Sequence, residues 1–308
     1  LRHYVAPTVI GLEAWDLDSV HRAMERAINP GVTMGSPLAK SAVDVAIHDA
    51  LGRARGVPVY ALLGRRRRTQ FDLTWMITTQ NPGEAPDMAR KGLDAGYECF
   101  ECKIGMHGEA GDLQMVTATR KAIGDRTLMV DANRGYRLDA AIRQARRFEN
   151  LGIMLFEQPL NGINLTGYRR LVESTTVPIG IDETLRSLPD MIEYIRAGAL
   201  SVAVAKVQRN GGFWYSRQMC ELAEAAGIGL SLSGLTETDL GLAAGLHLAA
   251  AFDISPLQLN GPQFIETTFL RERVWKGGGR VSLPEGPGLG VEVDEAYVRS
   301  HAQTLTLD

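Results

Sequence analysis

From about residue 70 onward, short apolar runs that read as β-strands alternate with stretches whose apolar residues recur at helical spacing. Eight such runs occur at a repeat of roughly 25 residues, and each run but the last is followed by a helical stretch. The runs span residues 71–78, 100–105, 127–133, 154–159, 177–183, 201–207, 228–234 and 254–259. Strands joined through helices are parallel, so eight of them predict a closed (β/α) barrel of the α/β class.

An open, doubly wound sheet shows the same alternation and is the alternative fold. Its dinucleotide-binding form carries G-x-G-x-x-G directly after the first strand, and no such motif follows the first run here. The glycine-rich GPGLG near residue 288 lacks the G-K-[S/T] of a phosphate-binding loop and reads as a turn. A chain of 308 residues with 45% hydrophobic content can bury the core of a barrel and of a second, smaller domain.

Composition disfavours several function classes. The formal net charge of −3 argues against nucleic acid or an anionic membrane as a partner. No apolar run approaches the roughly 18 residues of a membrane span, and the first residues do not resemble a signal peptide. Three cysteines indicate a reducing, cytoplasmic location without a disulfide framework. Cys99 and Cys102 form C-x-x-C within a predicted strand, where residues three apart face opposite sides, so they predict neither a metal site nor a redox couple.

Charged residues fall at or just after the carboxyl ends of six successive apolar runs, beginning with the second. They are Lys103, Asp131, Glu157, Asp182, Lys206 and Glu237. The carboxyl ends of parallel barrel strands converge on one mouth, where the active sites of such barrels are built. One charge in a buried strand usually belongs to a structural ion pair, whereas charge at the same depth of successive strands predicts a functional site.

Three of these residues, Asp131, Glu157 and Asp182, are carboxylates on adjacent predicted strands. They would repel one another unless a cation lay between them. Ligation by oxygen alone, with no nearby His or Cys, favours a hard ion, Mg²⁺ before Mn²⁺. The sequence therefore predicts a metal site on these three side chains.

Lys206 interrupts the apolar run SVAVAKV, where burial of a charged lysine is costly unless it is paired or deprotonated. Near a divalent cation, and partly desolvated, its pKa can fall from about 10.4 towards the roughly 7 to 8 of a general base. Lys103 flanks the predicted metal from the other side. A metal between two such groups suits removal of a proton alpha to the carboxylate of a small-molecule substrate, with the metal holding the enediolate that forms.

The motifs around these residues resemble the enolase superfamily, and within it the muconate lactonizing enzyme subgroup. The matching segments, in chain order, are ECKIG, VDANRGY, FEQPL, IDET, AVAKVQRNGG and SGLTETDLGLAAGLHLAAA. The resemblance implies that Lys103 and Lys206 are catalytic, that the three carboxylates are the metal ligands, and that Glu237 is the family's glutamate of the seventh strand. Sites of this superfamily use a Lys or His base and Mg²⁺ that stabilises the enediolate.

The resemblance also implies a modified TIM (β/α)7β barrel with a smaller α+β capping domain. Residues 39–64 resemble the helical end of that capping domain, and residues 280–295 resemble the return to it. We expect a capping segment at 1–68, a barrel at 69–280 and a return segment at 281–308. Because LRHYVAPTVIG resembles the middle of the family's capping domain, we expect that domain to be N-terminally truncated, without its antiparallel strands and lid loop.

One position departs from the K-x-K pattern of the family, where Glu101 replaces the first lysine. Alternation places Glu101 on the same face as Lys103 and one layer deeper in the barrel. A carboxylate there would raise the pKa of Lys103, which predicts that Lys103 is the acid or the weaker base of the two lysines. The alternative is that Glu101 is only a buried partner for another barrel residue.

Positions around the metal ligands are assigned to contacts with those ligands or with substrate, namely Glu101, Asn133, Glu183 and Gln208. We expect Asn133 on the same face as Asp131, where it could orient a ligand or a bound water. We expect Glu183 to point away from the metal, because its neighbour Asp182 faces the metal.

Glu237 lies just beyond the seventh run. We expect its side chain to reach the mouth of the barrel, within hydrogen-bond range of a catalytic group or of substrate. The alternative is a role at the start of the next helix, since Thr236, Thr238 and Asp239 around it also read as a capping segment.

Lysines on opposite sides of a substrate suit a two-base proton transfer at one carbon, so a racemase or epimerase of an amino-acid derivative is the narrow prediction. A dehydratase or cycloisomerase of the same superfamily is the alternative, because dehydration and epimerisation begin with the same enediolate. The mandelate racemase subgroup fits less well: it has an Asp on the sixth strand, where Lys206 stands, and a His near the seventh. None of the six histidines lies near residue 233, and His247 reads as a packing residue. Dipeptide epimerases carry D-x-D at the eighth strand, where this chain has Gln258-Leu259-Asn260.

Two further function classes do not involve removal of a proton alpha to a carboxylate with a metal. A class I aldolase would form a Schiff base on a barrel lysine, but it leaves the three carboxylates unexplained. A non-catalytic metal-binding barrel, with a site impaired by Glu101, is the other. The family resemblance suggests a homo-oligomer, a dimer or an octamer, with no nucleic-acid or membrane partner.

Overall fold

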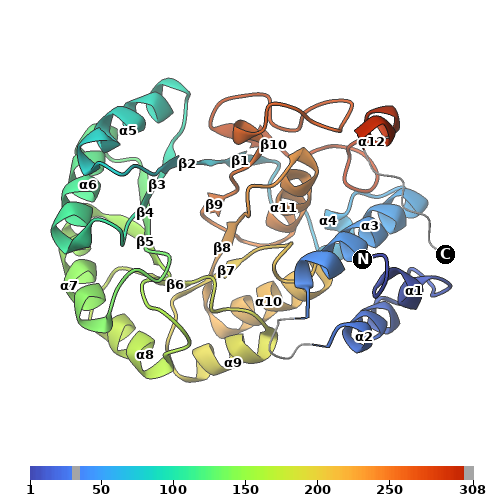
Figure 1. The fold of residues 1–308 in the computed structure, drawn as a ribbon, viewed down its shortest axis with the longest axis horizontal. Helices are drawn as coiled ribbons and strands as arrows, with labels where there is room; N and C mark the ends of the chain where they lie inside the picture. The colour runs from blue at the N-terminus through green and yellow to red at the C-terminus, as the bar shows by residue number, and fades with distance from the viewer. Residues whose placement is uncertain (30–34, 302–308) are drawn as a thin grey trace.

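The computed structural model describes residues 1–29 and 35–301 (Figure 1). Eight parallel strands form one sheet, and each strand pairs with its neighbours in chain order. They are β2 (Thr74–Ile77), β3 (Cys99–Lys103), β4 (Thr127–Asp131), β5 (Ile153–Glu157), β6 (Ile179–Ile181), β7 (Val202–Ala205), β8 (Gly229–Ser233) and β9 (Leu257–Gln258). The first and last strands are linked by Thr74 Oγ1, which donates to the Leu257 carbonyl at 2.7 Å. The predicted barrel is confirmed.

A helix follows each of the strands β2 to β8, and these helices surround the strands (Figure 1). They are α5 (Ala85–Asp94), α6 (Gly108–Ile123), α7 (Leu138–Phe148), α8 (Leu165–Glu173), α9 (Leu188–Arg196), α10 (Phe213–Ala226) and α11 (Asp239–Ala251). Helix α7 illustrates why they pack on the strands. Ala141, Ala145 and Phe148 recur at helical spacing and are buried, whereas Arg146 and Arg147 on the other face are exposed.

The first predicted run is divided in the structure. Its first half belongs to β1 (Gln70–Asp72), which pairs antiparallel with β10 (Arg280–Ser282) outside the barrel sheet. Only its second half, β2, enters the barrel. The eighth run is shortened to β9, because Pro256 before it has no N–H to donate to a strand ladder.

Cys99 and Cys102 lie on β3 and are free thiols. Cys102 is buried between the barrel and its helices, where its thiol donates to Thr119 Oγ1 at 3.4 Å. No helix in the described part of the chain is long and apolar enough to cross a membrane.

The helices described before β1 belong to the capping segment. They are α1 (Ala6–Val9), α2 (Leu17–Ala27), α3 (Pro37–Arg55) and α4 (Tyr60–Leu63), and α12 (Glu295–His301) ends the described chain. Helix α3 packs against α10, and α4 packs against α11. His247 on α11 is buried and accepts the Tyr60 N–H at 3.2 Å, in keeping with a packing role. The domain boundaries at 68 and 280 remain a prediction, and residues 30–34 and 302–308 of the predicted segments lie outside the described residues.

A buried polar cluster joins α2 and α3 to the barrel. Asp44 on α3 has no exposed surface, and its carboxylate accepts from His21 Nε2 at 2.8 Å and from the Phe213 N–H at 2.5 Å. His48 Nδ1 lies 3.3 Å from the same carboxylate. Burial opposes the charge on Asp44 and on His48. Hydrogen bonds from His21 and His48 outweigh burial at Asp44, and the hydrogen bond and charge of Asp44 outweigh it at His48. The pKa of Asp44 is lowered from 3.8, and the pKa of His48 is raised from 6.5.

These shifts predict a pH-dependent contribution of His48 to stability. Because the pKa of His48 is higher in the folded state, His48 stabilises the fold fully at pH values below 6.5, its pKa in the unfolded chain. This stabilisation is lost as the pH rises through the pKa of His48 in the folded state. The lowered pKa of Asp44 keeps its carboxylate charged at and somewhat below 3.8. We expect His48→Gln to cost on the order of 1 to 3 kcal/mol between about pH 4 and 6.5, and less above this range.

Urea denaturation of wild type and His48→Gln across this pH range measures the effect. The control is His48→Gln in an Asp44→Asn background, where the cost should no longer vary with pH. A cost that is constant with pH in the wild-type background would contradict the assignment.

Candidate active site

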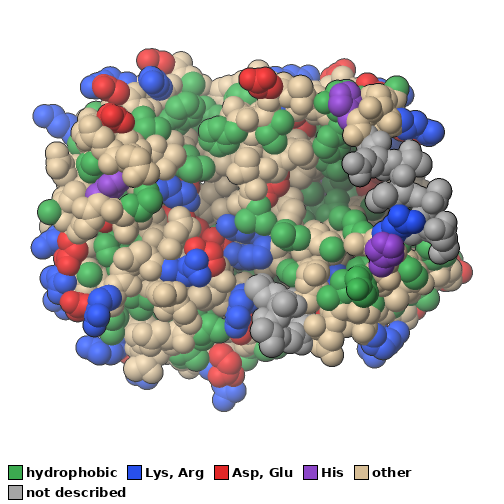
Figure 2. Space-filling view, in the orientation of Figure 1, with side chains coloured by type: hydrophobic (Ala, Val, Ile, Leu, Met, Phe, Trp, Pro, Cys, Tyr) green, Lys and Arg blue, Asp and Glu red, His purple; other side chains and the backbone are tan. Residues whose placement is uncertain are grey.

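The charged residues predicted at the strand ends lie at one end of the barrel. The strand register pairs Lys103 with Asp131 and Asp131 with Glu157. Asp182 directly follows β6, and Lys206 directly follows β7. All except Lys103, which is partly exposed, are buried, with Lys206 at 8% exposure. In Figure 2, basic and acidic side chains meet near the middle of the face shown.

Lys103 on β3 is held between two carboxylates. Its Nζ donates to Glu101 Oε1 at 2.5 Å and to Asp131 Oδ2 at 2.6 Å. The register pairs Glu101 with Met129, one layer deeper than the pair formed by Lys103 and Asp131. Burial opposes the lysine charge, but Glu101, Asp131 and Glu157 outweigh burial and raise the pKa of Lys103 well above its usual value. Glu101 therefore contacts Lys103 directly, and its charge contributes most to raising the pKa of Lys103.

Asp182 is held by two cations on the loop after β7. Lys206 Nζ lies 2.9 Å from Asp182 Oδ2, and Arg209 Nη1 donates to Asp182 Oδ1. The second terminal nitrogen of Arg209 donates to the Val204 carbonyl at 2.7 Å, which fixes the guanidinium against β7. Burial opposes the charge of Asp182, but Arg209 and then Lys206 outweigh it and lower the pKa of this carboxyl.

Glu157, between these two groups, has an amide as its hydrogen-bond partner. Gln258 Nε2 on β9 donates to Glu157 Oε2 at 2.6 Å, and Ser231 on β8 donates to Gln258 Oε1 at 3.1 Å. Burial, and then the charges of Asp131 and Asp182, raise the pKa of Glu157 well above its usual value. Repulsion among the three carboxylates is therefore strongest at the central one.

The residue types at this end of the barrel fit a hard divalent cation. Asp131, Glu157 and Asp182 supply buried oxygen ligands, and the raised pKa of Glu157 marks a place where added positive charge would be stabilising. As arranged here, each carboxylate is turned towards a lysine, an arginine or an amide. Accordingly, no group of three or more Asp, Glu, His or Cys side chains among the described residues stands ready to hold a metal.

The two lysines lie on opposite sides of the barrel. Lys103 ends β3 and Lys206 follows β7, and these strands are four places apart in the eight-strand order. In a closed barrel of eight strands, that separation sets inward side chains across the mouth from each other.

Glu237 lies between β8 and α11, and its side chain is 8% exposed. The Leu235 N–H donates to Glu237 Oε1 at 2.5 Å, and Glu237 Oε2 is buried without a hydrogen-bond partner in the described structure. Burial raises the pKa of Glu237, while the charge of Lys206 opposes the rise. A Cβ on Gly241 would lie 2.7 Å from the Glu237 side chain and 3.0 Å from Gln208 Nε2, so Glu237 and Gln208 pack on the same glycine.

Asn133 and Glu183 contact each other at the rim. Asn133 Nδ2 donates to Glu183 Oε1 at 3.0 Å, and the Asn133 N–H donates to Asp131 Oδ1 at 2.8 Å. We expected Asn133 on the face of Asp131, and Glu183 pointing away from the metal, because side chains alternate along a strand. Both residues lie beyond the ends of their strands, where this alternation does not apply. Strand β4 ends at Asp131 and β6 ends at Ile181, and Asn133 has a φ of 39°. The Glu183 carboxylate is therefore directed along the rim to the loop after β4.

Arg209 and Gln258 contact the predicted metal ligands and were not among the predicted site residues. Arg209 stands three residues after Lys206, beyond the apolar run, so alternation gave no signal for it. Gln258 follows the same rule as the other sites, a polar residue at the carboxyl end of a strand, and could have been found on that ground.

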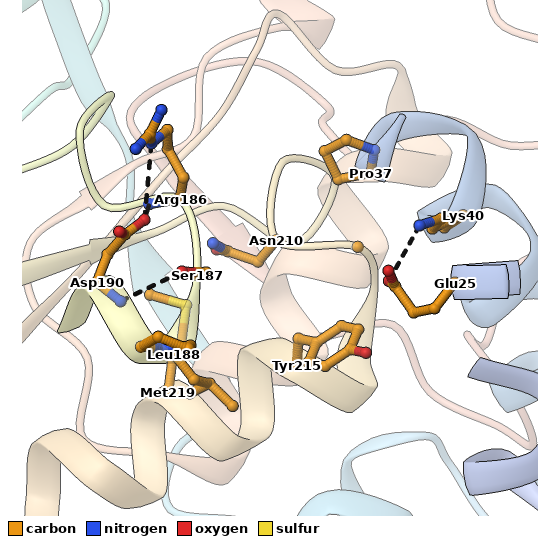
Figure 3. Close-up of a pocket in the computed structure, with 12 residues that line it drawn as sticks. Glu25, Pro37, Lys40, Arg186, Ser187, Leu188, Asp190, Asn210, Tyr215 and Met219 are labelled. Atoms are coloured by element: carbon orange, nitrogen blue, oxygen red, sulfur yellow. Dashed lines mark hydrogen bonds and ion pairs between the residues drawn. The ribbon is translucent and has the colours of Figure 1, made fainter. Parts of the chain in front are cut away.

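A separate cavity of about 400 Å³ lies where the capping helices meet the loops after β6 and β7 (Figure 3). Its charges pair with each other, Lys40 with Glu25 at 3.0 Å and Arg186 with Asp190 at 3.6 Å. The predicted catalytic and metal-binding residues are not among the described residues that line it. Asn210 connects it to the site, because its Oδ1 accepts the Lys206 N–H at 2.7 Å.

Comparison with known proteins agrees with this arrangement. The family model described as "Enolase C-terminal domain-like" matches residues 84–297, and that of the "Mandelate racemase / muconate lactonizing enzyme, N-terminal domain" matches residues 1–64. The chain belongs to the enolase superfamily. Its place there is with the mandelate racemase and muconate lactonizing enzymes, so the expected family, and an enzyme of that family, are confirmed.

Relatives within this family differ in their reactions. A chloromuconate cycloisomerase of Cupriavidus pinatubonensis is 30% identical over 98% of this chain and 81% of its own length. An L-Ala-D/L-Glu epimerase of Clostridium acetobutylicum is 30% identical over 95% of this chain and 81% of its own length. The structure of muconate lactonizing enzyme from Pseudomonas putida, 30% identical, superposes with a TM-score of 0.90 over 98% of this chain and 83% of that one.

Proposed function

We propose that this chain is a metal-dependent racemase or epimerase that removes a proton alpha to a carboxylate and returns one to the same carbon. The observation that carries the proposal is the pair of lysines across the barrel mouth, each ion-paired to a different carboxylate of the predicted metal site. A base on each face of a carbon lets one group remove the proton and the other return it, which inverts the centre.

Each residue has a distinct part in this proposal. Asp131, Glu157 and Asp182 would hold Mg²⁺ or Mn²⁺, which supplies electrostatic stabilisation to the negative charge that forms on the substrate carboxylate. Lys206 serves one face of the alpha carbon. Lys103 serves the other, and Glu101 keeps it more firmly protonated, so it is better suited to donate a proton than to take one.

The substrate class we propose is an amino-acid derivative other than a dipeptide. The family's dipeptide epimerases carry D-x-D at the eighth strand, where this chain has Gln258 and Asn260. Gln258 donates to Glu157, and Asn260 Nδ2 donates to the Gln258 carbonyl at 3.4 Å. Neither residue supplies the negative charge that would hold a substrate amine.

A cycloisomerase is the second candidate. It is supported by the 30% identity to the chloromuconate cycloisomerase and by the likeness to the muconate lactonizing enzyme. Such an enzyme needs proton transfer on one face only, so the second lysine would be a charge partner of its carboxylate.

The experiment is incubation of the Mg²⁺-loaded enzyme in D₂O with acyl-amino acids, proline derivatives and lactone precursors. We expect loss of the alpha-hydrogen NMR signal with loss of optical activity for an acyl-amino acid or proline derivative. Interconversion of a lactone and its open form without racemisation would favour the cycloisomerase. Absence of both exchange and lactone chemistry across the panel would contradict the racemase or epimerase and the cycloisomerase alike. Borohydride trapping of a lysine would indicate an aldolase.

A further inference from the structure

The loop from Lys206 to Gly212 connects β7 to α10 and is held by hydrogen bonds between its own residues. The Lys206 N–H donates to Asn210 Oδ1 at 2.7 Å, and the Lys206 carbonyl accepts the Asn210 N–H at 2.8 Å. The Gly212 N–H donates to the Val207 carbonyl at 2.8 Å. Lys206 and the start of α10 are therefore tied into one short, closed turn.

Asp44 from the capping segment holds the far end of that turn. Its carboxylate accepts the Phe213 N–H at 2.5 Å and the Trp214 N–H at 3.4 Å, and so caps α10 from a position 169 residues earlier in the chain. Gly212 lies directly against it. A Cβ at Gly212 would come within 2.2 Å of Asp44 Oδ1, and its φ of +104° also suits glycine.

Asp44 is itself held in place by two histidines of the capping segment. His21 Nε2 donates to it at 2.8 Å, and the His21 ring stacks on Trp214 with centroids 5.6 Å apart. His48 Nδ1 lies 2.9 Å from the Asp44 carbonyl and 3.3 Å from its carboxylate. The carboxylate thus has partners on α2, α3 and α10, and it cannot shift without moving the start of α10.

The loop that follows Lys103 is held differently. Asp112, on the helix α6 that this loop enters, accepts the Gly105 N–H at 3.0 Å and the Tyr136 hydroxyl at 2.6 Å. These partners all belong to the barrel, so the two lysines differ in whether the capping segment braces them.

We propose that Asp44 is a positioning residue for Lys206: it fixes the α10 end of the loop and thereby sets where the catalytic lysine stands relative to substrate. The path runs from Asp44 through Gly212 and Phe213 to Val207 and Lys206. The proposal rests on the proposed function for its catalytic consequence. It also makes the docked capping segment a requirement for proton transfer on one face of the substrate, with the other face independent of it.

The test is stereospecific α-proton exchange by Asp44→Ala and Asp44→Asn, using both enantiomers of an N-acyl amino acid that the wild type exchanges. For the enantiomer served by Lys206, we expect Asp44→Ala to lower kcat by about 10-fold to 100-fold with KM unchanged, as for a displacement of about 1 Å. Exchange from the other enantiomer should stay within about twofold of wild type. Asp44→Asn keeps one acceptor oxygen for the Phe213 N–H. For the enantiomer served by Lys206, its kcat should therefore lie between those of wild type and Asp44→Ala.

Asp49→Ala is the matched control. Asp49 is on the same helix and accepts the Leu289 N–H at 2.7 Å and Arg53 Nε at 2.9 Å, but its contacts lead to the return segment. It should lower thermal stability without changing the ratio between enantiomers. An equal effect of Asp44→Ala on both enantiomers, or the same change of ratio in Asp49→Ala, would overturn the proposal.

A second measurement does not depend on turnover. Amide hydrogen exchange of residues 206–214 should be faster in Asp44→Ala than in wild type, with residues 103–107 unchanged. If the wild type exchanges neither enantiomer, the proposed function fails while this measurement still decides whether Asp44 holds the loop. Unchanged protection at 206–214 would refute the positioning role by itself.

Discussion

Lys206→Ala should abolish α-proton exchange from one enantiomer of the substrate and leave measurable exchange from the other. The lysine lies on one side of the mouth only, directly after β7, and Lys103 stands across from it at the end of β3. Loss of a positioned acid or base costs about 10²-fold to 10⁴-fold, so the affected enantiomer should lose at least two orders of magnitude in exchange rate. Exchange in D₂O, followed by NMR for each enantiomer separately, measures it.

Lys103→Ala should give the opposite stereochemical pattern and the smaller loss. Glu101, at 2.5 Å, and Asp131, at 2.6 Å, hold Lys103 in its charged form, which makes it the poorer base. Lys40→Ala is the control, because it removes a similarly buried lysine whose partner, Glu25, lies in the capping segment. Full exchange of both enantiomers by Lys206→Ala would show that the buried lysine is structural.

Asp182→Asn should remove most of the affinity for Mg²⁺. The carboxylate is one of three on adjacent strands, and its negative charge also balances Lys206 and Arg209. Without that charge, the positive charges of Lys206 and Arg209 are left unbalanced beside the site and repel an incoming metal. Titration calorimetry should show binding to wild type and little or none to the variant at the same concentrations.

Thermal unfolding gives a second readout of the same prediction. At about 100 times Kd, bound Mg²⁺ should stabilise wild type by about 2.7 kcal/mol, whereas Asp182→Asn should unfold at the same temperature with and without it. The control is Glu183→Gln, since that neighbouring carboxylate contacts Asn133 and lies 3.8 Å from Arg134 on the rim. Binding of Mg²⁺ to Asp182→Asn with unchanged affinity would refute the ligand assignment.

The barrel and the location of its site could be predicted from local patterns in the chain. Strands and helices follow from apolar periodicity over 5 to 15 residues or so, and such periodicity depends on near neighbours alone. Once the strands are parallel, their carboxyl ends share one mouth. The convergence of Lys103, Asp131 and Glu157, and the pairing of Glu101 with Lys103 one layer below, follow from strand order and alternation.

Contacts made beyond the strand ends could not be predicted in this way. The return of Arg209 to Asp182, the bond from Gln258 to Glu157 and the direction of Glu183 all depend on where each strand stops and how the next loop turns. Asp44 reaches α10 across 169 residues because the capping helices dock there, and no local pattern carries that information. Periodicity assigns a residue to a face, whereas its partner on another element is set by the packing of the whole chain.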